Sequence, residues 1–178
     1  MIPWAKPTLL GREKDYVCDA LTSTWISGGP YVDRFEEELK SLLDIPFTVT
    51  TSNGTTALHL AYLALGIRPG DEIIFPGFAY MGAANAAILC GARPVFVDVD
   101  PATWCLAPTA IEQAITKKTK AVVPIHTYGN VSNLDAILAL AASHNIKVIE
   151  DAAESLGSRW EDRFEPPCVR LQTCGIID

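Results

Sequence analysis

Residues 121–151 read AVVPIHTYGNVSNLDAILALAASHNIKVIED, and the hydrophobic pattern of this stretch carries the clearest fold signal in the chain. Residues 121–125 form a short apolar run, residues 134–144 have apolar side chains at helical spacing, and Val148 and Ile149 are again apolar in the predicted strand 147–149. Apolar residues that follow one another without alternation are typical of strands buried on both faces. The stretch therefore predicts a strand–helix–strand unit of a parallel sheet.

The same alternation of short β-branched or aromatic runs with longer helical runs extends upstream to residue 47. We therefore predict an α/β fold with a mostly parallel sheet and helices on both faces. The further predicted strands are 47–51, 72–75 and 94–99, and the further predicted helices are 55–65, 80–89 and 108–115.

The two ends of the chain depart from this rhythm. Residues 12–21 and 32–43 have the spacing of amphipathic helices and flank a glycine-rich turn at 27–30. Residues 164–178 contain a Pro-Pro pair and show no clear helix or strand. We predict an N-terminal helical segment at 1–45, a partial large α/β domain at 46–163 and a divergent tail at 164–178.

Composition excludes several classes of function. The chain has 178 residues, 49% of them hydrophobic, which is enough for one core of ordinary size. A net charge of -7 leaves no basic stripe, so we expect no nucleic-acid partner and no anionic membrane surface. The N-terminus has no apolar signal region, and five cysteines match no zinc spacing. We expect a cytoplasmic protein with reduced thiols and no metal site.

Ligands of open α/β sheets bind beyond the carboxyl ends of the strands, so the residues just after each strand are the informative ones. At 51–56 the sequence TSNGTT joins a predicted strand to a predicted helix. Asn53 or Ser52 can cap this helix, and Gly54 leaves the first-turn N–H groups open, as a phosphate site requires. An ordinary capped helix explains the local sequence equally well, and neither G-x-G-x-x-G nor the P-loop pattern is present.

Three further junctions carry candidate residues. Tyr80 can stack on a flat ligand or pack the layer boundary, and His126 can act as an acid or base or be structural. Glu150 and Asp151 follow a buried strand, where carboxylates are costly to desolvate unless they are paired. In an extended segment these two point to opposite sides, which argues against a glycosidase carboxylate pair.

Five motifs in this order resemble the DegT/DnrJ/StrS family of sugar aminotransferases, which are pyridoxal 5'-phosphate (PLP) enzymes of fold type I. The resemblance runs from Ile2 to about Arg163 and includes TWISGGP near residue 25. The motifs are TSNGTTALHLA at 51–61, GDEIIFPGFAY at 70–80, PVFVDVDP at 94–101, PIHTYGN at 124–130 and VIEDAAESLG at 148–157.

The resemblance implies a role for each of five residues. Gly54 and Thr55 would hold the cofactor phosphate, Tyr80 would stack on the pyridine ring, and Asp151 would pair with the protonated ring nitrogen. Glu154 stands where the family often has Gln or His near the phenolic oxygen of the cofactor. An ionised glutamate is unfavourable beside a phenolate, so we expect Glu154 to be protonated or turned away.

The family reaction moves an amino group, commonly from glutamate, onto a keto-sugar nucleotide, and the family's enzymes are homodimers. The 150–157 motif is most similar to members that act on a GDP-linked keto-deoxysugar. The family also requires a Schiff-base lysine downstream of the aspartate, and no lysine follows Lys147. Lys117, Lys118 and Lys120 lie in a polar connection and are expected to be solvated surface residues.

The resemblance therefore implies the N-terminal part of a PLP-dependent sugar aminotransferase, without a catalytic residue of its own. A non-catalytic PLP- or ligand-binding remnant of the family is the main alternative, and an unrelated nucleotide-binding domain is a third. Because the resemblance stops abruptly, we expect another reading frame downstream of the tail to encode the missing lysine segment.

Overall fold

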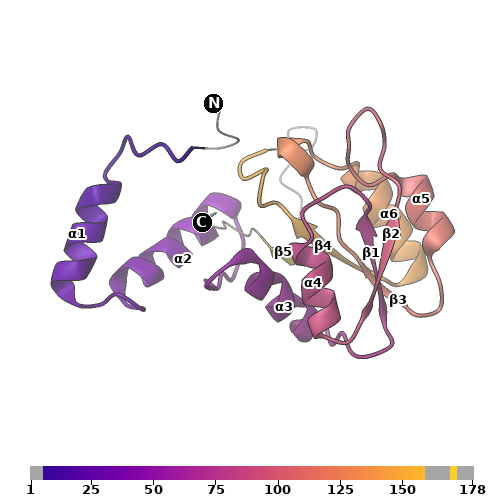
Figure 1. Cartoon of the computed structure of the whole chain (residues 1–178), viewed down its shortest axis with the longest axis horizontal. Helices are drawn as coiled ribbons and strands as arrows, with labels where there is room; N and C mark the ends of the chain where they lie inside the picture. Colours follow the sequence, from indigo (N-terminus) through magenta and orange to yellow (C-terminus); the bar gives the residue numbers. More distant parts are fainter. Residues whose placement is uncertain (1–5, 159–168, 172–178) are drawn as a thin grey trace. The chain divides into compact units, whose positions relative to one another are not determined.

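One sheet of five strands, in the order β2-β1-β3-β4-β5, organises the α/β part of the computed structural model (Figure 1). All four pairings between neighbouring strands are parallel. The structure describes residues 6–158 and 169–171. The strands are β1 (Glu72–Pro76), β2 (Arg93–Val97), β3 (Thr119–Val122), β4 (Lys147–Asp151) and β5 (Val169–Leu171).

Helices cover both faces of this sheet, as the sequence predicts (Figure 1). On one face α3 (Gly54–Ala64) and α4 (Gly82–Leu89) enclose a core that contains Tyr62 and Ile149. On the other face α5 (Pro108–Ala114) and α6 (Leu134–His144) enclose a second core that contains Val148. The parallel sheet with helices on both faces is thus confirmed.

The chain divides into two compact units, Met1–Thr50 and Thr51–Asp178. The first contains α1 (Glu13–Ser23) and α2 (Pro30–Leu43), which match the two predicted amphipathic helices. Gly29 has a φ of 97°, a conformation that glycine adopts without a steric penalty, and Pro30 follows it at the first position of α2. The predicted glycine-rich turn therefore sets the start of α2.

The predicted strand at 47–51 is wrong. This segment is assigned to no strand, and its polar groups bond to α2 instead. Thr48 Oγ1 donates to the Glu36 carbonyl at 2.8 Å, and the N–H and hydroxyl of Thr50 donate to Glu36 Oε1 at 2.7 and 2.9 Å. Phe47 remains 84% exposed. The β-branched alternation signals strand propensity, but it does not supply a partner strand.

The expectation that residues 164–178 contain no strand is also wrong. Strand β5 (Val169–Leu171) pairs in parallel with β4, in a register that places residue 169 beside Ile149 and residue 171 beside Asp151. A three-residue run is too short for periodicity to reveal, whereas the open edge of β4 supplies N–H and C=O partners for it. The remaining residues of the predicted tail lie outside the described ranges.

Residues 6–158 and 169–171 contain neither a membrane-spanning helix nor a metal-binding cluster. None of the helices there combines the length and apolar character needed to cross a bilayer. Nor do those residues contain a group of three or more His, Cys, Asp or Glu side chains placed to hold a metal ion.

A buried carboxylate ties the beginnings of the strands together. Glu72, at the start of β1, is 4% exposed and accepts hydrogen bonds from Thr116 Oγ1 at 2.7 Å and from Arg93 Nη2 at 2.7 Å. The bonds from Thr116 and then from Arg93 lower the pKa of Glu72 below its ordinary value. A carboxyl of this kind stabilises the fold above its unfolded-state pKa, and the contribution is lost as the pH falls through the folded-state pKa.

Replacing Glu72 with glutamine is therefore expected to lower the free energy of unfolding at neutral pH by about 1–3 kcal/mol, because a buried bonding group loses its charged partner. The difference from the wild type should shrink as the pH falls into the acid range. Urea denaturation at several pH values measures both effects. Glu112→Gln, on the exposed side of α5, is the matched control. An equal loss in both variants would contradict the assignment.

Candidate active site

The N-terminus of α3 begins directly after Asn53, beside residues that follow the carboxyl end of β1. Asn53 caps the helix, because its Oδ1 accepts the N–H of Thr56 at 2.9 Å. Gly54 and Thr55 occupy the first turn, whose N–H groups have no intrahelical acceptor. Gly54 and Thr55, which are half-buried, therefore lie at the positive end of the helix dipole, the end that attracts anions.

Thr55 and Tyr80 come together over Gly82, the first residue of α4. A Cβ atom placed on Gly82 would lie 3.2 Å from Thr55 Oγ1 and 3.3 Å from the ring of Tyr80. The absence of a side chain at Gly82 therefore allows the hydroxyl and the ring to approach the same point. Tyr80 is 84% exposed, so its ring is available to a ligand. Sequence reasoning identified Thr55 and Tyr80 but not the glycine that accommodates them.

Asp151 ends β4 and is buried on the face of the sheet that α3 covers. Ile149 belongs to the core under α3 and α4, and side chains alternate along a strand, so Asp151 lies on that same face. Its Oδ1 accepts the N–H of Ala153 at 3.2 Å. Burial, and then the negative charge of Asp151, raise the pKa of the Tyr62 hydroxyl in α3. Glu150 lies on the opposite face, as the sequence predicts.

Glu154 is bonded to the turn that follows β3. Its Oε2 accepts the backbone N–H of Tyr128 at 2.6 Å, and Tyr128 has a φ of 56°, in the left-handed region. A non-glycine residue in this region is strained unless its surroundings hold it there. The carboxylate of Glu154 therefore supports this turn, η1 (Thr127–Gly129).

Two buried hydroxyl groups beside these residues have no hydrogen-bond partner within the described part of the chain. They are Thr127 Oγ1, which follows β3, and Ser155 Oγ, which follows β4. Buried polar groups are nearly always bonded in folded proteins, so hydroxyls of this kind suit a polar ligand or water. Thr127 belongs to the motif at 124–130 and Ser155 to the motif at 148–157, and nothing in the spacing of either motif marks its hydroxyl as unpartnered.

An exposed aromatic cluster also lies on the loops after β1, β2 and β3. Phe78 and Trp104 meet edge to face with ring centroids 5.2 Å apart, and Tyr128 lies 6.3 Å from Phe78 and 6.1 Å from Trp104. The three residues are far apart in sequence, so spacing alone could not group them. The loops bring them together because carboxyl ends of parallel strands share one edge of the sheet.

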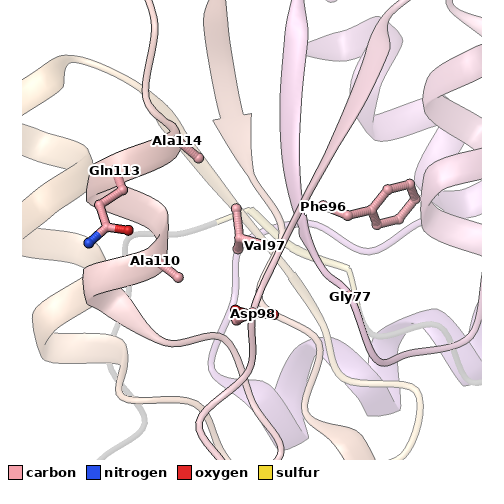
Figure 2. Close-up of a pocket in the computed structure, with 7 residues that line it drawn as sticks. All are labelled: Gly77, Phe96, Val97, Asp98, Ala110, Gln113 and Ala114. Atoms are coloured by element: carbon pink, nitrogen blue, oxygen red, sulfur yellow. The ribbon is translucent and has the colours of Figure 1, made fainter.

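A cavity of about 350 Å³ lies elsewhere, between β2 and α5 (Figure 2). Figure 2 shows Gln113 and Ala110 on the helix and Val97 and Asp98 on or beside the strand. Strands β1 and β3 separate β2 from β4 in the sheet, and none of the five predicted site residues lines this cavity. Its lining residues are Gly77, Phe96, Val97, Asp98, Ala110, Gln113 and Ala114.

Known proteins share both the sequence and this architecture. The chain is 46% identical over 164 residues to a GDP-perosamine synthase from Escherichia coli O157:H7, and the alignment covers 92% of this chain and 45% of that protein. The aminotransferase TlmJ from Streptoalloteichus hindustanus superposes with a TM-score of 0.86 at 36% identity, over 92% of this chain and 45% of that one. The PLP form of a putative sugar aminotransferase from Streptococcus pneumoniae gives a TM-score of 0.81 at 32% identity, over 88% and 44%.

These alignments define how far the likeness extends. The chain spans less than half the length of the relatives it matches, so it corresponds to part of a fold type I aminotransferase. The sequence model of the DegT/DnrJ/EryC1/StrS aminotransferases matches residues 7–168, which is most of the chain and reaches slightly beyond the predicted end of the resemblance. The chain therefore belongs to the DegT/DnrJ/EryC1/StrS aminotransferase family.

Proposed function

We propose that this chain is the N-terminal part of a PLP-dependent aminotransferase that transfers an amino group, from glutamate, to a keto-sugar nucleotide. The observation that carries the proposal is that a helix N-terminus and an exposed ring approach the same point, while a buried carboxylate lies on the face of the sheet that α3 covers. These features belong to Gly54 and Thr55, to Tyr80 and to Asp151. A helix N-terminus can hold a phosphate, an exposed ring can lie against a pyridine face, and a carboxylate can pair with a protonated ring nitrogen.

The residues present fit PLP. The first-turn N–H groups of Gly54 and Thr55 would hold the phosphate, and the exposed ring of Tyr80 would lie against the pyridine face. Gly82 carries no side chain that would press on Thr55 Oγ1 or on the Tyr80 ring, since a Cβ there would lie only 3.2 and 3.3 Å from them. The unpartnered hydroxyls of Thr127 and Ser155 offer further polar contacts.

Asp151 would face the ring nitrogen of the cofactor. Its side chain is 9% exposed in the structure, and a carboxylate in such a place favours a protonated partner. When bound, a cofactor protonated at this nitrogen acts as an electron sink. Glu154 accepts the Tyr128 N–H. We propose that Glu154 shapes the site through the turn that it holds.

The chain on its own would bind the cofactor without completing the reaction. Removing an acid–base residue typically costs about 10² to 10⁴ in rate, and the described residues place no lysine beside Asp151. The missing group must come from the portion of the family fold that this chain does not cover.

A chimera tests the whole proposal. Residues 1–158 of this chain, joined to the portion of the E. coli GDP-perosamine synthase that the chain does not cover, should aminate a GDP-linked keto-deoxysugar with glutamate as donor. Asp151→Asn in the chimera should lower the rate by at least about 10²-fold, in the range of a lost electrostatic contact. The appended portion alone is the control. A folded chimera that binds cofactor but aminates no keto-sugar nucleotide would refute the function.

We also propose that the chain self-associates, as part of a homodimeric enzyme. Helix α1 buries none of its residues, and its apolar side chains Val17 and Leu21 are 59% and 61% exposed. Trp25 and Ile26, which follow it, are 65% and 72% exposed. Large apolar side chains exposed four residues apart on one helix suit an interface between copies of the chain.

Light scattering should therefore give a mass above the 19.3 kDa of one chain. The double substitution Val17→Ser and Leu21→Ser should shift the mass toward one chain, because it removes apolar area from the exposed face of α1. Thr22→Ser, on the same helix, is the control. A wild-type chain that stays monomeric at high concentration would contradict this proposal.

The remaining partners follow from composition. We propose a cytoplasmic enzyme that binds sugar-nucleotide and amino-donor small molecules and neither nucleic acid nor membranes. The net charge of -7 supports the exclusion of nucleic acid and anionic membranes, because the phosphate-rich surfaces of both would be repelled.

A further inference from the structure

Three buried polar side chains form a cluster behind Asp151, on the other face of the sheet. His126, Ser132 and Glu150 are 3%, 0% and 3% exposed. His126 Nε2 lies 3.3 Å from Glu150 Oε2, and the backbone N–H of Ser132 donates to His126 Nδ1 at 3.3 Å. Such a network is costly to bury unless its members are satisfied, so its retention beside a site residue calls for an explanation.

The bond from Ser132 determines the protonation of the imidazole. A backbone N–H can only donate, so Nδ1 must present its lone pair and the ring proton must lie on Nε2. That proton then points to Glu150 Oε2. The Ser132 Oγ also lies 3.4 Å from Nδ1, where it too can donate. This geometry favours the Nε2–H tautomer of His126, which donates a hydrogen bond to the Glu150 carboxylate.

The main chain links this bond to Asp151. The His126 N–H donates to the Asp151 carbonyl at 3.1 Å, and the Asp151 N–H donates to the Pro124 carbonyl at 2.9 Å. His126 therefore holds two successive residues of β4, Glu150 by its side chain and Asp151 by its backbone. Because Glu150 and Asp151 alternate across the strand, fixing Glu150 on one face also fixes the direction of Asp151 on the other.

We infer that His126 is a positioning residue which, held in its neutral Nε2–H form by Ser132, anchors Glu150 and thereby aims Asp151 at the bound cofactor. The inference rests on the proposed PLP site and adds to it a residue that does not touch the ligand. Hydrogen-bonded partners behind a ligating group are worth about 10- to 100-fold in affinity or activity where they have been measured at metal sites.

Two substitutions separate the two bonds of the imidazole. In His126→Gln the amide N–H₂ can take the place of Nε2–H and donate to Glu150. In His126→Asn the shorter amide oxygen can replace Nδ1 as acceptor for Ser132, but the bond from residue 126 to Glu150 is lost. The probe is pyridoxamine 5'-phosphate labelled with ¹⁵N in the ring, added to the full 178-residue chain. Its affinity and the ¹⁵N shift of the ring nitrogen, which reports protonation, are both measured.

The expected result is that His126→Asn weakens binding about tenfold and shifts the bound ring nitrogen toward its unprotonated form, while His126→Gln stays near the wild type on both measures. A merely structural role would lower the melting temperature without moving the nitrogen signal of the bound fraction. If folded His126→Asn binds as tightly as the wild type with the same nitrogen shift, the inference is overturned.

A measurement without cofactor distinguishes failure of this inference from failure of the proposed function. Wild-type protein that does not bind the probe refutes the PLP site, and two observations on the free chain then decide the role of His126. A ¹⁵N spectrum showing the proton on Nε2, with faster amide hydrogen exchange at Asp151 in His126→Asn than in His126→Gln, supports the anchoring of β4. A proton on Nδ1, or equal exchange in both variants, overturns it.

Discussion

Replacing Asp151 with asparagine is expected to weaken pyridoxamine 5'-phosphate binding by about 30-fold or more, since loss of one partner of a buried charge pair costs about 2 kcal/mol or more. Asparagine keeps the size of the side chain and an oxygen to accept the Ala153 N–H, so the fold should survive. Asparagine carries no negative charge, so it cannot stabilise a positive charge on the ring nitrogen. Isothermal titration calorimetry of the full chain measures the change.

Asp98→Asn is the matched control for this experiment. Asp98 follows β2 at the same edge of the sheet, is exposed, and lines the separate cavity beside α5. Removing its charge changes the net charge of the chain by the same amount but should leave binding within about twofold, as surface charges at a distance are largely screened. An equal loss in the two variants would mean that Asp151 has no special relation to the ligand.

The parallel α/β architecture was predictable because its signal is local. Residues 121–125 and 148–149 are apolar without interruption. The helix predicted at 134–144 has the bounds that the structure gives it. The helix has helical spacing of apolar residues and a cap at Asn133, whose side chain accepts the N–H of Ala136. Periodicity and capping act over one or two turns, so the sequence displays them directly.

The two errors in strand assignment have a common physical cause. Residues 47–51 have the composition of a strand but bond to Glu36 of α2, whereas residues 169–171 follow a Pro-Pro pair and nevertheless pair with β4. Strand formation requires hydrogen bonds to another segment, and the identity of that segment is not written in the strand itself. Local pattern therefore predicts strand propensity better than it predicts pairing.

In the candidate site, too, features within one short segment were predictable, whereas contacts between residues far apart in the sequence were not. The capped N-terminus at Asn53 and the carboxylates at 150–151 stand out in the sequence because each is a local departure from an ordinary strand end. The bond between His126 and Glu150 joins residues 24 positions apart, and neither residue alone suggests it. Only the pairing of β3 with β4 makes that contact visible.

The second large effect concerns covalent binding of PLP, which we expect to be absent at any single lysine of the α/β unit. The four lysines there are Lys117, Lys118, Lys120 and Lys147. The first three lie around the start of β3, and Lys147 is the first residue of β4. In a parallel sheet the beginnings of all strands share one edge, and Asp151 stands at the opposite edge.

The separation along β4 is large compared with the reach of a side chain. Lys147 and Asp151 are four residues apart, and a rise of about 3.3 Å per residue separates their Cα atoms by about 13 Å. All four side chains are exposed and lie at the wrong edge to meet a cofactor paired with Asp151.

Borohydride reduction of the PLP-treated chain, followed by peptide mass spectrometry, should therefore yield scattered, substoichiometric adducts. Dialysis before reduction should remove the ligand. A stoichiometric phosphopyridoxyl adduct at one of these lysines, abolished by Asp151→Asn, would contradict the placement of the site.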